Sequence, residues 1–330
     1  MAHLPLVLVA FSILLALGQI LGALGWGGWL LDFFCQFPIQ IACVQALVFF
    51  ILVVSFALRA RHVMWFPILP LFFSIYLARG DSGFLPPPKS PPSIVPERTL
   101  RIVSFNVSSA NRNFEETMDY LRSVDPDVFG LIEVNHAWEA ALSSQFPQYD
   151  RKIIAPETGA FGLGLFSKFP LENARLEFSE VTGIPSIAAR FTVQGEDVDV
   201  VLTHAYPPIS PKLFRERNRQ LSAIAARRSE FAQNWIVMGD FNCGPWSPYF
   251  RDFVSATGLR DSRAGFGFQA SWPTSNPILR VPIDHVFLPR TWRVVRRNIG
   301  PAIGSDHFPV VVEVALPDQR EAPHRGKKSQ

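Results

Sequence analysis

The segment "PIDHVFLPRTWRVVRRNIGPAIGSDHFPVVVEV" (residues 282–314) contains three short apolar runs that predict β-strands. An Asp-His pair stands at the start of the first run and another just before the third. Burying such polar groups among Val, Ile and Phe is unfavourable unless each group finds a partner. Either the histidines are satisfied core residues, or the strand ends carry a reaction site, and the rest of the chain has to decide.

More runs of strand length precede this segment, and few helices lie between them. Strands are predicted at "LRIVSFNV" (100–107), "DPDVFGLIEV" (125–134), "FGLGLFS" (161–167), "SIAARFTV" (186–193), "VDVVLTH" (198–204) and "WIVMGDF" (235–241). Helical spacing predicts helices over 113–124, with Asn113 and Glu116 as an approximate capping box, and over 211–232. Many strands with few helices predict two packed sheets covered by helices, rather than a regular βαβ alternation.

The N-terminal part has a different composition, because three long runs carry no charge: residues 4–31, 33–58 and 63–78. The first two exceed the roughly 20 apolar residues that a membrane-spanning helix needs. The third is shorter and contains two prolines, so it is either a spanning helix or a surface or re-entrant segment. The first run lacks the basic start of a secretory signal. We therefore expect residues 1–80 to anchor the protein in a lipid bilayer through two or three transmembrane helices.

Basic residues around these runs suggest a topology. Arg59 and Arg61 lie between the second and third runs, and the positive-inside tendency favours the cytoplasm for that loop. With three crossings, the chain would be a multi-pass cell-membrane protein, and everything after residue 80 would be extracytoplasmic. Arg79, Lys89 and Arg98 act against this orientation, which reverses if the third run does not cross.

The remainder of the chain divides into three parts. Residues 81–98 include "LPPPKSPPSIVPE", which predicts a stiff, extended linker. Residues 99–316 have a globular composition with nearly equal numbers of basic and acidic residues, so they lack the basic excess of a nonspecific duplex-binding protein. Residues 317–330 are polar and basic, and they predict a disordered tail.

Several predicted strands end or begin at a residue suited to metal or phosphate chemistry. These residues are Asn106, Glu133, His204, Asp240 with Asn242, Asp284, and Asp306 with His307. Each has an ordinary structural explanation when taken singly, as a turn cap, a solvated acid or a core histidine. Together they supply oxygen ligands of the kind that Mg²⁺ or Mn²⁺ prefers. They also supply a base for a water molecule and donors for phosphate oxygens.

The order of these motifs carries a family resemblance. The series "SFNV", "LIEV", "TH", "GDFN", "IDHV" and "GSDHFPV" resembles the endonuclease/exonuclease/phosphatase superfamily over about residues 99–316. That superfamily includes deoxyribonucleases, abasic-site endonucleases, inositol polyphosphate 5-phosphatases and neutral sphingomyelinases. The chain looks most like bacterial members with hydrophobic N-terminal helices. The resemblance implies a four-layer α/β/β/α sandwich of two mostly antiparallel sheets, with the site at one end of both.

The resemblance also implies a role for each residue. Glu133 would be the principal ligand of Mg²⁺ or Mn²⁺, and Asn106 and Asp306 would complete or support the metal shell. His307, held by Asp284, would be the general base or a phosphate contact. Asp240 would orient the attacking water or take its proton. The groups that contact the scissile phosphate would be Asn242 and His204. By contrast, His285 falls on the opposite strand face and is expected to be structural.

The leading hypothesis is therefore a membrane-anchored, divalent-metal-dependent phosphoesterase. It would hydrolyse phosphodiester or phosphomonoester bonds by in-line attack of an activated water. An endonuclease or exonuclease acting on nucleic acid is one version. A sphingomyelinase-like or inositol-phosphate phosphoesterase, acting on a lipid or a small molecule, is the alternative. A membrane-tethered binding module without catalysis is the hypothesis from a different class.

Overall fold

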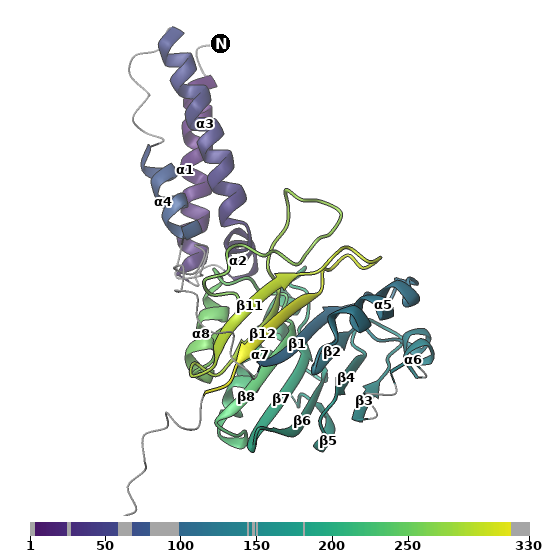
Figure 1. Cartoon of the computed structure of the whole chain (residues 1–330). Helices are drawn as coiled ribbons and strands as arrows, with labels where there is room; N and C mark the ends of the chain where they lie inside the picture. The colour runs from purple at the N-terminus through teal and green to yellow at the C-terminus, as the bar shows by residue number, and fades with distance from the viewer. Residues whose placement is uncertain are drawn as a thin grey trace, which may run out of the picture.

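The computed structural model describes residues 4–24, 28–58, 68–79, 99–143, 145–146, 149, 151–180 and 182–317. The predicted linker (81–98) and all but the first residue of the predicted tail lie outside these residues. Four N-terminal helices precede two β-sheets with flanking helices (Figure 1).

The N-terminal helices are α1 (Leu4–Ala23), α2 (Trp29–Gln36), α3 (Pro38–Leu58) and α4 (Ile68–Arg79). Three of them, α1, α3 and α4, pack side by side and point away from the sheets (Figure 1). In the described part of the chain, α1 is the one helix that is long and apolar enough by itself to cross a membrane. A bend of 76° separates α2 from α3, and the two would count as a second span if taken together.

The third predicted membrane crossing corresponds to α4, which is short. Helix α4 has 12 residues, which at a rise of 1.5 Å each make it about 18 Å long, against a hydrocarbon core of about 30 Å. The start of the uncharged run, residues 63–67, lies outside the described residues. The described helix alone is therefore too short to span a bilayer.

The first sheet joins the two ends of the region from residue 99 to residue 315. Its strands lie in the order β11 (Arg293–Ile299), β12 (Val310–Ala315), β1 (Thr99–Asn106), β2 (Val128–Ile132), β4 (Leu163–Ser167) and β3 (Arg151–Ala155). Only the central β1–β2 pair is parallel.

The second sheet is built from one continuous stretch of chain. Its order is β5 (Glu172–Phe178), β6 (Pro185–Val193), β7 (Glu196–His204), β8 (Asn234–Asp240), β10 (Asp284–Leu288) and β9 (Arg260–Asp261). Again only the central pair, β7–β8, is parallel. The prediction of two mostly antiparallel sheets is confirmed.

Alternation along the central strands produces the layers. Leu100 and Ile102 of β1 enter the core between the two sheets, whereas Val103 and Phe105 pack on the other face. That outer face is covered by α5 (Phe114–Val124) and α6 (His136–Leu142). The outer face of the second sheet is covered by α7 (Pro211–Ala226) and α8 (Pro248–Thr257). The result is the four-layer α/β/β/α sandwich.

Two local predictions were wrong. Asn113 makes no capping hydrogen bond with its side chain, which instead donates to Glu116 Oε2 at 3.3 Å, so the capping box is absent. The helix predicted to reach residue 232 ends at Ala226 and is followed by a 3₁₀ turn, η2 (Arg228–Glu230). Phe231, directly after this turn, stacks on Trp235 of β8, at 4.8 Å between ring centroids.

A buried charge cluster connects the far edge of the second sheet to the first sheet. Asp261 lies 3.4 Å from Arg263 Nε and 3.2 Å from His285 Nδ1. Burial by itself raises the pKa of Asp261, but the charges of His285, Arg263 and Arg297 outweigh it, so the pKa is lowered. The side chains of Arg263 and Arg297 are both fully buried, and Arg297 belongs to β11 of the first sheet. Both arginines depend on the Asp261 carboxylate for their counter-charge.

We therefore expect Asp261→Asn to lower the free energy of unfolding by about 3 to 5 kcal/mol, because it leaves buried cations unpaired. Thermal unfolding of the full chain in detergent measures this. Asp197→Asn is the matched control, since Asp197 is exposed and lies 3.9 Å from Arg190, and exposed pairs contribute about 0 to 1 kcal/mol. Equal effects of the two substitutions would contradict the prediction.

Candidate active site

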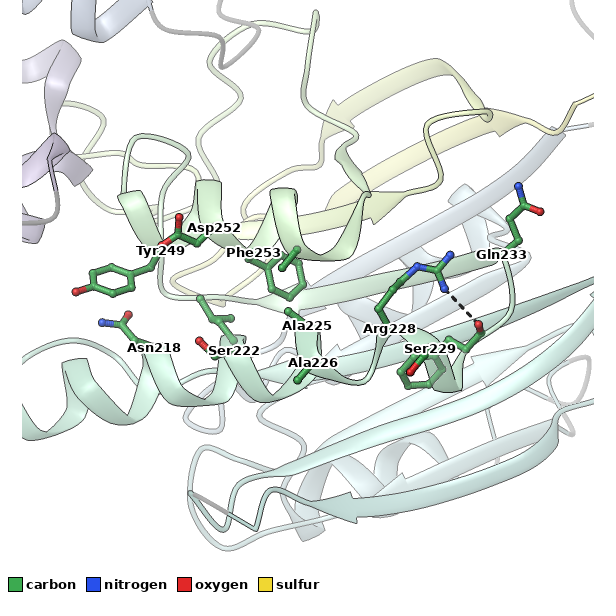
Figure 2. A pocket seen from close by; sticks show the side chains of 13 residues that line it. Asn218, Ser222, Ala225, Ala226, Arg228, Ser229, Gln233, Tyr249, Asp252 and Phe253 are labelled. Atoms are coloured by element: carbon green, nitrogen blue, oxygen red, sulfur yellow. Dashed lines mark hydrogen bonds between the residues drawn. The ribbon is translucent and has the colours of Figure 1, made fainter.

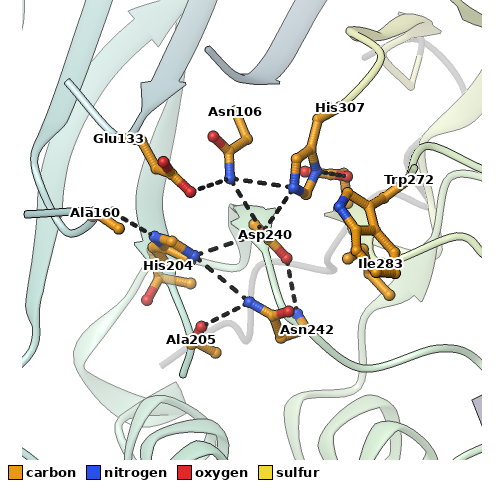
Figure 3. A network of polar contacts seen from close by, with 12 residues as sticks. Asn106, Glu133, Ala160, His204, Ala205, Asp240, Asn242, Trp272, Ile283 and His307 are labelled. Carbon is orange, nitrogen blue, oxygen red and sulfur yellow. Dashed lines mark hydrogen bonds and ion pairs between the residues drawn. The ribbon is translucent and has the colours of Figure 1, made fainter. Parts of the chain in front are cut away.

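The polar strand ends meet at one edge of the sandwich (Figure 3). Asn106, His204 and Asp240 are the last residues of β1, β7 and β8. Asp284 begins β10, which runs antiparallel to β8 and so starts at the same edge. In the sheet register Asp240 pairs with His204 on one side and with Asp284 on the other. Sheet pairing alone therefore holds three titratable side chains in a row.

Asn106 connects the two sheets. Its Nδ2 donates to Glu133 Oε1 at 3.0 Å and to Asp240 Oδ2 at 3.2 Å. Its Oδ1 accepts a hydrogen bond from the backbone of Ser108 at 3.0 Å, which fixes which end of the amide faces the carboxylates. Asn106 therefore orients Glu133 and Asp240, and this geometry suits support of a metal shell better than direct ligation through oxygen.

Two site residues have left-handed backbone conformations, which are rare for side chains with a Cβ. Glu133 has φ of 64° and Asn242 has φ of 46°. Such conformations cost on the order of 1–3 kcal/mol and persist only where the surroundings hold them. The carboxylate of Glu133 is held by Ser109, whose N–H donates to Oε2 at 3.0 Å. Glu133 is half-buried, and each of its carboxylate oxygens accepts one hydrogen bond, which leaves further lone pairs on both.

Asp240 lies at the centre of the network. Its Oδ1 accepts from the Asn242 N–H at 2.9 Å, and its Oδ2 lies 3.5 Å from His204 Nε2 and 3.6 Å from His307 Nε2. Burial and the charge of Asp284 raise the pKa of Asp240 to about 6. The preceding Gly239 has φ of 145°, and a Cβ there would meet the Thr203 carbonyl oxygen at 1.8 Å. The "GD" sequence thus reflects the close approach of β7 and β8.

His307 and Asp284 form a dyad. The Nδ1 of His307 lies 2.8 Å from Asp284 Oδ2, which leaves Nε2 pointing toward Asp240. Burial opposes the charged imidazolium, yet the carboxylates of Asp284 and Asp240 outweigh it and raise the pKa of His307 to about 10. Ser305 fixes the loop by donating from Oγ to the Asn106 carbonyl at 2.7 Å and accepting from the His307 N–H at 3.0 Å.

His204 and Asn242 present nitrogen atoms to the same space. His204 Nδ1 lies 2.8 Å from the Ala160 carbonyl, which can only accept, so this nitrogen carries a proton. Its Nε2 lies 3.5 Å from Asn242 Nδ2, and that amide also donates to the Ala205 carbonyl at 2.9 Å. These contacts fix both side chains beside Asp240 (Figure 3).

Asp306 lies apart from this network. Its carboxylate is exposed and accepts a hydrogen bond from the Trp272 indole N–H at 3.0 Å. The Trp272 ring is itself 6.3 Å from the His307 ring, centroid to centroid. Asp306 therefore lies at the rim beside the dyad, through a tryptophan that the motif analysis did not assign to the site.

The donors present fit a hard divalent cation. Asp240, Asp284 and His307 can each bring one ligand atom to within 4.8 Å of the others. Asp284 Oδ1 is buried and has no hydrogen-bond partner among the described groups, so it is a carboxylate oxygen with unused capacity. The dyad hydrogen bond already occupies the facing atoms of Asp284 and His307, however. The accessible carboxylate of Glu133 is the more open position, and the oxygen-rich set suits Mg²⁺ or Mn²⁺.

Sequence reasoning identified the polar side chains that meet at this edge, but not the groups that hold them. Seven of the eight candidates form one network, and Asp306 borders it. His285 lies elsewhere, with its ring between Asp261 and the Cys243 carbonyl, as a structural residue would. The supports that were missed are Ser109, Ala160, Ser271 and Ser305. Of these, Ser305 had a sequence signal, because it is part of "GSDH".

A cavity elsewhere in the molecule does not belong to this site. It has a volume of about 790 Å³ and lies between α7 and α8 (Figure 2). Asn218, Ser222, Tyr249 and Phe253 are among the residues that line it, and none of the network residues does. The polar network, rather than this cavity, is the candidate for catalysis.

Comparisons with solved structures agree with the fold. TDP2 from D. rerio, in complex with a single strand DNA product, has a TM-score of 0.56 at 18% identity, covering 67% of this chain and 100% of that chain. The catalytic domain of human Nocturnin with bound sulfate has a TM-score of 0.56 at 17% identity, covering 68% and 97%. An endonuclease/exonuclease/phosphatase family protein from Bacteroides thetaiotaomicron has a TM-score of 0.56 at 18% identity, covering 67% and 98%. At these identities the likeness concerns the fold.

No curated protein matches the sequence. A family model does match, over residues 103–307, and this range contains all eight candidate residues. It begins within β1 and ends at the His307 of the dyad, so it includes strands of both sheets and leaves out β12. The chain belongs to the endonuclease/exonuclease/phosphatase family.

Proposed function

We propose that this protein is a membrane-anchored, divalent-metal-dependent phosphoesterase that hydrolyses phosphodiester or phosphomonoester bonds by in-line attack of water. One observation carries the proposal: Asp240 lies within 3.6 Å of two imidazole nitrogens and is linked through Asn106 to Glu133. Two carboxylates, two imidazole rings and an amide are thus assembled around one space, which supports a proton acceptor, phosphate contacts and a metal ligand there.

Glu133 is proposed as the principal ligand of Mg²⁺ or Mn²⁺, with Asp306 and Asn106 completing or supporting the shell. When bound, the cation supplies positive charge that stabilises the negative charge developing on the phosphate oxygens. The half-buried position of Glu133 and its hydrogen bond from the Ser109 N–H support this assignment. The contact between Asp306 and Trp272 holds the second carboxylate at the rim.

The chain's own groups supply the remaining chemistry. Asp284 holds the His307 ring so that Nε2 points into the site and donates to a nonbridging phosphate oxygen. The carboxylates of Asp284 and Asp240 raise the pKa of His307 to about 10, which keeps the ring protonated and favours a phosphate contact over a general base. Asp240 then orients the attacking water and accepts its proton. His204 and Asn242 direct nitrogen atoms to the same space and contact the scissile phosphate.

Membrane anchoring is supported by the path of the chain. Helix α2 contacts the proposed catalytic region, residues 99–316. Helix α3, about 31 Å long at 1.5 Å per residue, leads away from that region (Figure 1). The chain returns through α4 (Figure 1), and the segment with Arg59 and Arg61 connects α3 to α4 in the sequence. A cytoplasmic position for that segment corresponds to an extracytoplasmic catalytic region. A reporter fused after residue 317 tests this, and activity of the fusion only in the cytoplasm contradicts it.

The function is tested with the purified full chain in detergent. We expect phosphoesterase activity that requires Mg²⁺ or Mn²⁺, is abolished by EDTA and returns when the metal is restored. Single-stranded and plasmid DNA, abasic duplex, sphingomyelin and inositol phosphates should be compared side by side. The single strand DNA product in the TDP2 structure supports nucleic acid as one substrate class. Absence of metal-dependent hydrolysis of every one of these substrates would favour a non-catalytic binding module.

A further inference from the structure

One charged side chain interrupts the apolar N-terminal part of the sequence. Asp32 is the only charged residue between residues 4 and 58. It belongs to α2, the short helix between α1 and α3, and its side chain is 3% exposed. A buried carboxylate in so apolar a segment requires a partner. That partner comes from the catalytic region.

Helix α2 is held against the catalytic region by side-chain hydrogen bonds from two of its residues. Asp32 Oδ2 pairs with Arg217 Nη2 of α7 at 3.0 Å, and Arg217 is fully buried. Asp32 Oδ1 accepts from Ser247 Oγ at 2.5 Å. One turn along the helix, Gln36 Oε1 accepts from the Gly244 N–H at 2.5 Å. Gly244 is the last residue of the "GDFNCG" segment and Ser247 follows three residues later, so both bonds reach the loop that follows Asp240.

Arg217 extends the contact into the active site. Its Nη1 donates to the Asn242 carbonyl at 3.0 Å, and the Asn242 N–H donates to Asp240 Oδ1 at 2.9 Å. Asn242 is one of the two site residues with a left-handed backbone, which its surroundings have to maintain. Asp32 is thus connected to Asp240 through two residues.

We propose that Asp32 is a positioning residue of the active site, which acts through Arg217 to hold Asn242 and Asp240 in place. The N-terminal helices are then part of the catalytic unit as well as an anchor. This inference rests on the proposed function for its kinetic consequence, whereas its structural consequence, a fixed loop at residues 240–247, can be measured without any activity.

The test compares three variants of the full chain in detergent. Asp32→Asn keeps the shape and the Ser247 contact but removes the counter-charge of Arg217. We expect kcat to fall about 10- to 100-fold, with KM changed less than about twofold, because misplacement of catalytic groups by about 1 Å has effects of this size. Hydrogen–deuterium exchange of residues 240–247 should be faster. Arg217→Gln, added to Asp32→Asn, should cause little further loss, since the two residues act as one unit.

Asp199→Asn is the control for a purely structural role. Asp199 is also a buried carboxylate paired with an arginine, at 2.8 Å from Arg190 Nε, but it lies within the second sheet and contacts no site residue. It should lower thermal stability without changing kcat or the exchange of residues 240–247. The inference is overturned if Asp32→Asn, like this control, leaves hydrogen–deuterium exchange of residues 240–247 at the wild-type rate. If the wild-type chain shows no activity, and Asp32→Asn still accelerates this exchange, the proposed function is refuted and the positioning role is retained.

Discussion

Glu133→Gln is expected to lower kcat by about 10³-fold and to abolish the stimulation by Mg²⁺, because a neutral amide binds hard divalent cations weakly. The substituted side chain keeps its size and can still accept from the Ser109 N–H. The fold should therefore be preserved. Steady-state rates across a Mg²⁺ titration measure the kinetic effect, and isothermal calorimetry of the full chain measures cation binding directly.

Glu139→Gln provides a control on the same side of the molecule. Glu139 lies on α6, six residues further along the chain, and its exposed carboxylate pairs with His136 at 3.3 Å. We expect this variant to keep the wild-type rate and Mg²⁺ dependence. A Glu133→Gln enzyme with wild-type rate and wild-type cation binding would remove Glu133 from the metal site.

Asp240→Asn is expected to lower kcat by about 10³-fold, because the proposed proton acceptor is lost. Only the ionised carboxylate accepts a proton, so the wild-type rate should rise as the pH passes upward through the pKa of Asp240. This pKa is raised to about 6 by burial and by Asp284, and a bound cation shifts it to lower pH. In the Asp240→Asn variant, kcat should no longer fall as the pH drops through this pKa.

Stability gives this prediction an independent check. A carboxylate whose pKa is raised on folding destabilises the native state at every pH above its unfolded pKa. Asp240→Asn should therefore raise the thermal unfolding temperature while it lowers the rate. An unchanged rate, or a loss of stability large enough to explain the lost activity, would contradict the proposed role.

The sequence predicted the fold where strands are buried. The central strands of both sheets have continuous apolar runs, such as "IVSF" in β1 and "WIVM" in β8, and all of these were recognised. The edge strands β3 and β5 were missed, because "ENARLEF" is exposed along nearly its whole length and has no apolar alternation. The helices α6 and α8 were missed because they are short and follow motif-rich loops.

For the site, the chemistry of single residues was predictable but the partners were not. Asn106, His204 and Asp240 could be grouped because each ends an apolar strand. The orientation of the Asn106 amide depends on Ser108 in the following turn, which has no sequence signature. The pairing of Asp32 with Arg217 joins residues 185 positions apart. An ion pair between such distant segments depends on tertiary packing, which no local pattern encodes.

The arrangement of the first sheet has a consequence for the order of folding. Strand β1 pairs with β12 from Thr99 opposite Ala315 to Ser104 opposite Val310. This central strand therefore cannot be fully paired until β12, the last strand among the described residues, has been synthesised. The second sheet comes from consecutive strands and can assemble while synthesis continues. Contacts between such distant segments form slowly. Because His307 lies three residues before Val310, the first residue of β12, a nascent chain cannot complete this polar network until β12 has emerged from the ribosome and entered the sheet.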